Sequence, residues 1–257
     1  MGSLYLTRWP DNFDDVEITG TTVQYLDSGE VLFANEMFSP GMQLCKWRSR
    51  VNYLDQGIKP TLPLLEVGKE YTVLAVLTAD RTPAVQLRIT FFDVNGEKLK
   101  MISSTTLSKA FVFPEGAVSY EVALVNLNHT WIKFQYLMIK TTEDARQVTA
   151  RLDRTSGWIA VQADETIGMD EQSAVLQISY GSRTTMAIPS ATNQPSLLVR
   201  AYVDDANVMK MLTDIRQTLA HTHFTQVKYL PGQRERFSPE IRAQVDELAA
   251  HLLIEEN

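Results

Sequence analysis

Residues 31–49 constrain the fold of this chain more than any other segment. An apolar run at 31–33 precedes a Pro40-Gly41 turn, and a second strand-like run follows the turn and ends in Trp47. Proline presets φ at the first corner of a turn, and glycine accepts the positive φ that follows. The segment therefore predicts two strands joined across a sharp turn, which is the unit of an all-β domain.

The same pattern continues through residues 20–140. Runs rich in β-branched and aromatic residues alternate with turn residues, and the 3.6-residue period of a helix is absent. Residues 27–30 offer a glycine for one hairpin, and Asn95-Gly96 is a strong hairpin signal. Strands at such regular spacing predict a jelly-roll β-sandwich. The predicted strands are residues 23–26, 31–33, 42–47, 71–77, 85–91, 111–113, 120–127 and 131–139.

The pattern changes after residue 140, and we predict three parts: a sandwich at 1–140, a linker at 141–155 and a small α/β unit at 156–257. Residues 141–155 are polar and charged, which is typical of a linker or a short helix. In the last part, strand-like runs alternate with apolar residues at helical spacing. Ser238-Pro239 is a typical helix start. The predicted elements there are strands at 157–161, 174–178, 185–188, 197–203 and 226–230 and helices at 208–219 and 239–252.

Charge and cysteine content exclude several classes of protein. The net charge is -7, which disfavours a general nucleic-acid surface because such surfaces neutralise phosphates with Lys and Arg. The single cysteine, Cys45, forms no intramolecular disulfide, which fits a reducing compartment. The chain shows no signal-peptide pattern and no apolar stretch near the roughly 20 residues of a membrane-spanning helix. We therefore expect a cytoplasmic protein whose membrane contact, if any, is peripheral.

The residues that could carry catalysis each have a simpler interpretation. His221 and His223 lack a third ligand and fall where a helix ends, a place that favours histidine. Ser182 lacks the second glycine of a nucleophile elbow. Cys45 has an apolar strand context that predicts a buried thiol, and residues 93–96 indicate a hairpin, not a calcium loop. We predict a protein that is not an enzyme and holds no metal or cofactor.

Aromatic residues offer a binding hypothesis. Sugar-binding sandwiches stack exposed rings on pyranose faces, and Trp9, Trp47, Tyr53 and Trp131 are the candidates. We favour core positions for Trp47 and Trp131, since large aromatics in small sandwiches mostly serve burial. Trp9 stands in a polar N-terminal segment, and we expect it to be the most exposed of the four.

A longer series of residues carries a family resemblance. In order, the series is Tyr25, Gly29, Val31-x-Phe33-x-Asn35-x-Met37, Pro40-Gly41, Trp47-x-Ser49, Tyr53, Leu62-Pro63-Leu64-Leu65, Gly68-x-x-Tyr71, Ile89-x-Phe91, Gly96, Phe113-Pro114, Tyr120 and Phe134. It resembles the third of the accessory Sec proteins, a family that assists export of serine-rich-repeat glycoprotein adhesins in Gram-positive bacteria. The resemblance covers about residues 20–140. One departure is Met37-Phe-Ser-Pro40-Gly41, which stands where the family has Met-Pro-x-Gly.

The resemblance implies a fold similar to carbohydrate-binding modules and a role without catalysis. It implies a stable complex with the first accessory Sec protein, which has a glycosyltransferase-like fold, and with the second, which is similar to acyl-group hydrolases. The complex would deliver the glycosylated adhesin to the accessory Sec motor ATPase and channel. Candidate residues for binding a partner or a glycan are Trp9, Asn35, Met37, Trp47 and Tyr53.

Two other functions remain open from the sequence. One is a free-standing glycan-binding module, which an exposed Trp9 or Tyr53 would support. The other is an enzyme whose site lies in the last part of the chain, where Asp204 and Asp205 follow the strand at 197–203. For these two aspartates we favour helix capping, because Asp at a helix N-terminus accepts an orphan backbone N–H.

Overall fold

The computed structural model describes most of the sandwich and the main elements that follow it. The described residues are 3–10, 13–26, 30–51, 60–141, 148–153, 158–163, 173–180, 185–189, 197–203, 208–218, 226–229 and 237–252. The chain divides into two compact units. Unit 1 comprises Met1–Leu26, Glu30–Ala145 and Thr184–Ala191, and unit 2 comprises the remainder.

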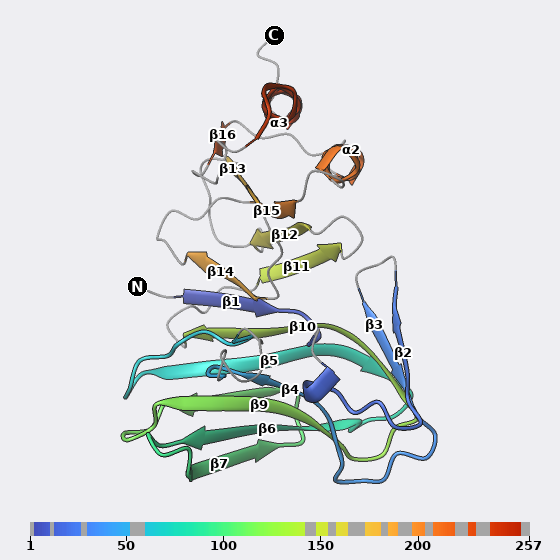
Figure 1. Cartoon of the computed structure of the whole chain (residues 1–257), viewed down its shortest axis with the longest axis vertical. Helices are drawn as coiled ribbons and strands as arrows, with labels where there is room; N and C mark the ends of the chain where they lie inside the picture. The colour runs from blue at the N-terminus through green and yellow to red at the C-terminus, as the bar shows by residue number, and fades with distance from the viewer. Residues whose placement is uncertain are drawn as a thin grey trace. The chain divides into compact units, whose positions relative to one another are not determined.

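Unit 1 is an antiparallel β-sandwich of a seven-stranded and a four-stranded sheet. Its elements are β1 (Ser3–Thr7), the 3₁₀ turn η1 (Phe13–Asp15), β2 (Thr22–Tyr25), β3 (Val31–Ala34), β4 (Gln43–Arg48), β5 (Glu70–Ala79), β6 (Val85–Phe92), β7 (Lys98–Ser104), β8 (Ser108–Val112), β9 (Ser119–Asn126), β10 (Trp131–Thr141) and β14 (Thr185–Pro189). Figure 1 shows β1, β10 and β5 of one sheet above β9, β6 and β7 of the other.

Strand β10 organises the larger sheet. β5 pairs with it along residues 132–141, and β8 lies beyond β5. The opposite edge of β10 is shared, because β3 pairs with residues 131–134 and β1 pairs with residues 137–140. β2 pairs with the other edge of β3, and β14 pairs with the other edge of β1. The smaller sheet has the simple order β4-β9-β6-β7.

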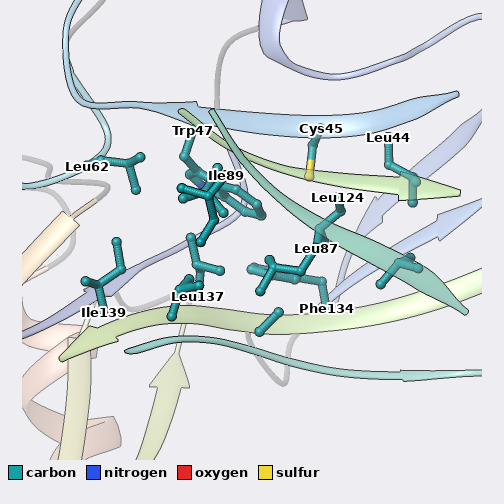
Figure 2. Close-up of a cluster of buried hydrophobic side chains, with 14 of the residues drawn as sticks. Leu44, Cys45, Trp47, Leu62, Leu87, Ile89, Leu124, Phe134, Leu137 and Ile139 are labelled. Carbon is teal, nitrogen blue, oxygen red and sulfur yellow. The ribbon is translucent and has the colours of Figure 1, made fainter. Parts of the chain in front are cut away.

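The alternating sequence of the strands explains the core. In β6, the residues Val85, Leu87, Ile89 and Phe91 are buried, and the residues between them face outward. β9 places Val122 and its alternate neighbours opposite these positions in register. Inward side chains from both sheets form one apolar cluster, and Figure 2 shows those of β4, β6 and β9 meeting those of β10. Each fully buried large side chain contributes about 1.5–3 kcal/mol to folding.

An aromatic group lies at the centre of this cluster. Trp47 of β4 stacks on Phe134 of β10 at 5.4 Å between ring centroids. Trp9 packs against both rings, at 6.4 Å from Trp47 and 5.3 Å from Phe134. The indole Nε1 of Trp47 donates a 2.7 Å hydrogen bond to the carbonyl oxygen of Arg8, which fixes the N-terminal segment to the core.

The expectation that Trp9 is exposed is therefore wrong, since its side chain is 1% exposed. Its polar neighbours in the sequence suggested a surface segment. Burial of an indole over other aromatic rings outweighs that local preference, because aromatic side chains bury the largest apolar area. The core position predicted for Trp47 is confirmed, and Trp131 is half-buried.

The eight predicted strands of the sandwich are all present. The structure adds β1 and β7, which were not predicted, and β14, which was predicted as the strand at 185–188 but assigned to the α/β unit. Asn95-Gly96 turns the chain between β6 and β7, with Gly96 at φ 81. The Asp93 carboxylate accepts hydrogen bonds from the backbone N–H groups of Asn95 and Glu97. This Asx turn connects the two strands of the hairpin that the sequence predicted.

Unit 2 is a small α/β unit with a mixed sheet in the order β11-β12-β15-β13-β16. β13 pairs in parallel with both β15 and β16. Helices α2 and α3 contact each other, and Arg216 pairs with Glu247 at 3.2 Å. Ser238 caps α3 by accepting the N–H of Ile241 at 3.3 Å. The elements are β11 (Val148–Asp153), β12 (Trp158–Ala163), β13 (Ser173–Tyr180), β15 (Leu197–Val203), α2 (Val208–Thr218), β16 (Gln226–Tyr229) and α3 (Pro239–Leu252).

The structure differs from the predicted three parts at two points. Strand β11 lies within the predicted linker at 141–155, where Val148, Ala150 and Leu152 alternate with polar residues at the strand period. Strand β14 comes from the predicted α/β unit at 156–257 but pairs with β1 and belongs to unit 1. Sheet partners so distant in sequence leave no local signal of their pairing.

Candidate functional site

Two loops at one end of the sandwich form the candidate site, which we call the Met37 platform (residues 16–21 and 35–42). Asn35 follows β3 and is only 7% exposed. Its Nδ2 donates to the carbonyl oxygen of Thr19 at 3.1 Å and to the hydroxyl of Thr21 at 2.9 Å. Its Oδ1 accepts the backbone N–H of Met37 at 2.9 Å. One side chain thus joins the two loops and shapes the turn that carries Met37.

A second asparagine, Asn126 at the end of β9, holds the other end of the platform. Its Nδ2 donates to the carbonyl oxygen of Phe38 at 2.6 Å. Its backbone carbonyl accepts the N–H of Gly41, and its backbone N–H donates to the carbonyl oxygen of Met42, each at 2.8 Å. Gly41 has φ 87, a conformation that strains residues with a Cβ atom. The Pro-Gly turn predicted from the sequence is therefore anchored to the sheet at both of its sides.

The platform presents apolar side chains to solvent. Met37 is 90% exposed, and Ile18 and Met42 are also exposed. Single exposed apolar residues are ordinary, but these three stand on backbone that buried hydrogen bonds hold in place. An apolar surface that is already ordered loses little entropy when a partner binds it. Methionine adapts its shape to a partner and is common at protein-binding surfaces.

Carboxylates flank the apolar residues. Glu36 precedes Met37, and Glu17 precedes Ile18. Hydrogen bonds from the hydroxyl and the backbone N–H of Thr19 lower the pKa of Glu17. Protein–protein interfaces commonly combine apolar residues with polar and charged residues at their rim.

The structure separates the five predicted binding residues. Trp9 and Trp47 lie in the core and cannot reach a partner. Asn35 is buried and acts by positioning, whereas Met37 is exposed. Tyr53 lies outside the described residues. Sequence reasoning missed Ile18 and Asn126, and the polar 16–21 segment gave no signal that it folds against the 35–42 loop.

A second feature is a hollow of about 570 Å³ at the other end of the four-stranded sheet. It is open to solvent and combines one aromatic ring, Phe92, with hydrogen-bonding groups. The lining comes from the first residues of β9, from two residues that follow β4 and from the β6–β7 hairpin. The lining residues are Arg50, Val51, Phe92, Asp93, Val94, Asn95, Gly96, Ser119 and Glu121.

The described residues place no catalytic arrangement at the platform or in the hollow. Within them, no group of three or more His, Cys, Asp or Glu could hold one metal ion. Cys45 is fully buried, and burial raises the pKa of its thiol well above the usual range. Ser182, His221, His223, Asp204 and Asp205 lie outside the described residues. Of the helices that the structure describes, none has the length and apolar composition to cross a bilayer.

Comparisons with known proteins converge on one family. Residues 18–141 match the family model described as "Accessory Sec secretory system ASP3". A curated accessory Sec system protein of the same designation, from Streptococcus gordonii, is 28% identical over 127 residues, covering 49% of this chain and 80% of that protein.

Two solved structures extend the comparison. One chain in the crystal structure of accessory secretory proteins 1, 2 and 3 of Streptococcus pneumoniae is 30% identical, covering 52% of this chain and 94% of that chain at a TM-score of 0.50. A chain of the Gap123 complex of Streptococcus agalactiae is 15% identical, with a TM-score of 0.52, covering 98% of this chain and 90% of that chain. The second likeness concerns the fold alone.

Proposed function

This chain belongs to the accessory Sec secretory system ASP3 family, and from that premise we propose that it is a non-catalytic interaction subunit of the accessory Sec system. The observation that carries the proposal is the exposed Met37 on a turn fixed by buried Asn35. Such a surface is suited to binding another protein, and it offers nothing for bond-making. The platform lies almost entirely within the segment that matches the family model.

The proposed partners are other accessory Sec proteins. The first, with a glycosyltransferase-like fold, and the second, similar to acyl-group hydrolases, would form a cytoplasmic complex with this chain. Support comes from a solved assembly of accessory secretory proteins 1, 2 and 3 that contains a chain similar to this one. In the proposed sequence of events, the complex assists export of a glycosylated serine-rich-repeat adhesin through the motor ATPase.

Co-purification with the first accessory Sec protein tests the proposal. The two proteins should co-elute from a size-exclusion column at micromolar concentration, and Met37→Asp should separate them because it places a charge in an apolar contact. Leu64→Asp is the matched control, since Leu64 is 80% exposed and lies near Tyr120 at the opposite end of β9. Separate elution of the unmodified proteins, or equal losses in the two variants, would remove the Met37 platform as the interface.

The hollow beside Phe92 supports a second candidate function, binding of a glycan. A half-buried ring next to amide, carboxylate and guanidinium groups offers both stacking and hydrogen bonds to sugar hydroxyls. On a glycan array, the full chain should bind, and Phe92→Ala should abolish the signal. Val112→Ala, at an exposed apolar residue on β8, should leave it unchanged. An array without any bound sugar rejects this candidate.

A further inference from the structure

The outer face of the four-stranded sheet carries two cations, Lys46 and Arg88, that form no ion pair among the described residues. Lys46 lies between the core residues Cys45 and Trp47, and Arg88 lies between Leu87 and Ile89. Because successive side chains of a strand alternate between faces, Lys46 and Arg88 point away from the core. Both side chains are half-buried on that face.

Strand register brings these two cations into one row. Ala123 of β9 pairs with Lys46 on one side and with Arg88 on the other. Neighbouring strands lie about 4.8 Å apart, so the two Cα atoms are about 10 Å from each other. Ala123 between them is itself buried, with 5% of its surface exposed. Ser103 of β7, which pairs with Arg88, extends the row with an exposed hydroxyl.

Arg88 is poorly satisfied within the part of the chain that the structure describes. Its only hydrogen bond there is a long one, 3.4 Å, from Nη2 to Gln86. Its Nε is buried without a hydrogen-bond partner among those residues. Lys46 has no carboxylate within ion-pair distance in the same described ranges. A half-buried guanidinium without an anion is costly, and its fork of donors matches a carboxylate in two parallel hydrogen bonds.

The neighbouring row contains a cation that, unlike Lys46 and Arg88, has carboxylates close to it. Arg48 of β4 pairs with the buried Asp15 and lies 3.8 Å from Glu121. These two carboxylates therefore already have a partner. Lys46 and Arg88 remain as a positive pair on a chain whose net charge is -7.

We propose that the row formed by Lys46, Ala123, Arg88 and Ser103 binds an extended, carboxylate-bearing segment of a partner protein. An Asp or Glu side chain of the segment accepts hydrogen bonds from Arg88 and Lys46. Two cations suit one such carboxylate, whereas phosphate backbones and anionic membranes require broad positive surfaces that an acidic chain lacks. The row lies on sheet strands, apart from the Met37 platform, so this interaction is independent of the proposed function.

A labelled peptide tests the proposal on the full chain. The probe is a short fluorescein-labelled Ser-Gly peptide that contains several Glu residues, and its Gln counterpart is the reference. Fluorescence polarisation should show binding of the Glu peptide that weakens with salt, and at least about tenfold weaker binding of the Gln peptide. The double variant Lys46→Gln, Arg88→Gln should lower the affinity for the Glu peptide by about tenfold or more.

Two controls separate a specific site from general charge. Lys98→Gln, Lys100→Gln removes the same charge from the exposed β7 edge and should leave the affinity unchanged. The Arg88→Lys variant keeps the charge but loses the paired N–H donors of the guanidinium. Its affinity for the Glu peptide should therefore fall between those of the unmodified chain and the double variant. Circular dichroism confirms that each variant is folded.

The proposal is overturned by any of three results. They are no binding of the Glu peptide at millimolar concentration, equal losses in the two double variants, or tighter binding of a phosphoserine peptide, a DNA duplex or phosphatidylserine vesicles that depends on Arg88. Met37→Asp should not affect peptide binding, and a failure of the Met37 interface would leave this result unchanged.

Discussion

The side-chain oxygen of Asn35 accepts the backbone N–H of Met37 at 2.9 Å, so a residue that is 7% exposed fixes one that is 90% exposed. The same amide joins the turn to Thr19 and Thr21. Asn35 thus holds the turn in place, and Met37 exposes its side chain to solvent. Substitution of Asn35 should therefore lower stability much more than substitution of Met37.

Asn35→Ala should lower the free energy of unfolding by about 1–3 kcal/mol, because it removes hydrogen bonds from buried groups. Met37→Ala should change it by less than about 0.5 kcal/mol, as expected of an exposed side chain, while weakening partner binding. Urea denaturation measures the first effect and co-purification the second. A stable Asn35→Ala protein with full partner binding would show that the hydrogen bonds do not organise the platform.

Trp9→Ala should lower the free energy of unfolding by about 3–5 kcal/mol, the usual cost of removing a fully buried large aromatic side chain. The same change would have a small cost if Trp9 were a surface residue for sugars. Trp131→Ala is a useful comparison, since Trp131 is half-buried and its ring faces Lys133 Nζ at 5.9 Å. Denaturation curves of the two variants should differ clearly, and similar small losses would contradict the core position of Trp9.

Cys45 should react with thiol reagents at pH 8 on the order of a thousandfold more slowly in the native protein than in urea, because access requires opening of the core. Burial raises the pKa of this thiol. A raised pKa in the folded state means that stability is complete below the unfolded value of about 8.5 and falls as the pH rises beyond it. Cys45→Ala should flatten that fall, and rapid labelling of the native chain would refute the burial.

His129 should make the protein less stable in mild acid. Its ring is buried, with Nδ1 at 3.0 Å from the carbonyl oxygen of Ala84, and burial lowers its pKa despite that hydrogen bond and the nearby Asp80. The unfolded chain therefore binds the proton more readily, so stability present above pH 6.5 is lost as the pH falls below it. His129→Gln should reduce the slope of unfolding free energy between neutral and mildly acidic pH, and an unchanged slope would contradict this assignment.

A chain that ends at residue 145 tests the role of β14. It would leave the edge of β1 unpaired, and open strand edges associate with one another. We expect a lower unfolding midpoint and concentration-dependent association on size-exclusion chromatography. A monomer as stable as the full chain would show that the β1–β14 pairing contributes little.

Much of the sandwich could be predicted from its sequence because its strands carry their own signals. β6 alternates apolar and polar residues, and Asn95-Gly96 marks the hairpin that follows it. β7 was missed as a separate strand, since it lies at the edge of the sheet and its apolar residues Leu99 and Met101 are exposed. Lysine on an edge strand is expected, because it discourages association with other edges.

The candidate site was harder to predict than the fold. The family motif included Met37 and Asn35, but it did not reveal that one presents the surface and the other supports it. The burial of Trp9 depends on Trp47, Phe33 and Phe134, which come from distant parts of the chain. Hydrogen bonds from Asn126 to the 37–42 loop likewise join residues far apart in sequence.

The pairing of β1 with β14 sets a condition on synthesis at the ribosome. Residues 3–7 emerge first, yet their outer neighbour is residues 185–189, and the whole of β2 to β13 is translated between them. One edge of β1 therefore stays unpaired during synthesis until residues 185–189 have been made. A chaperone that shields this edge during translation would act on β1 well before α3 is made.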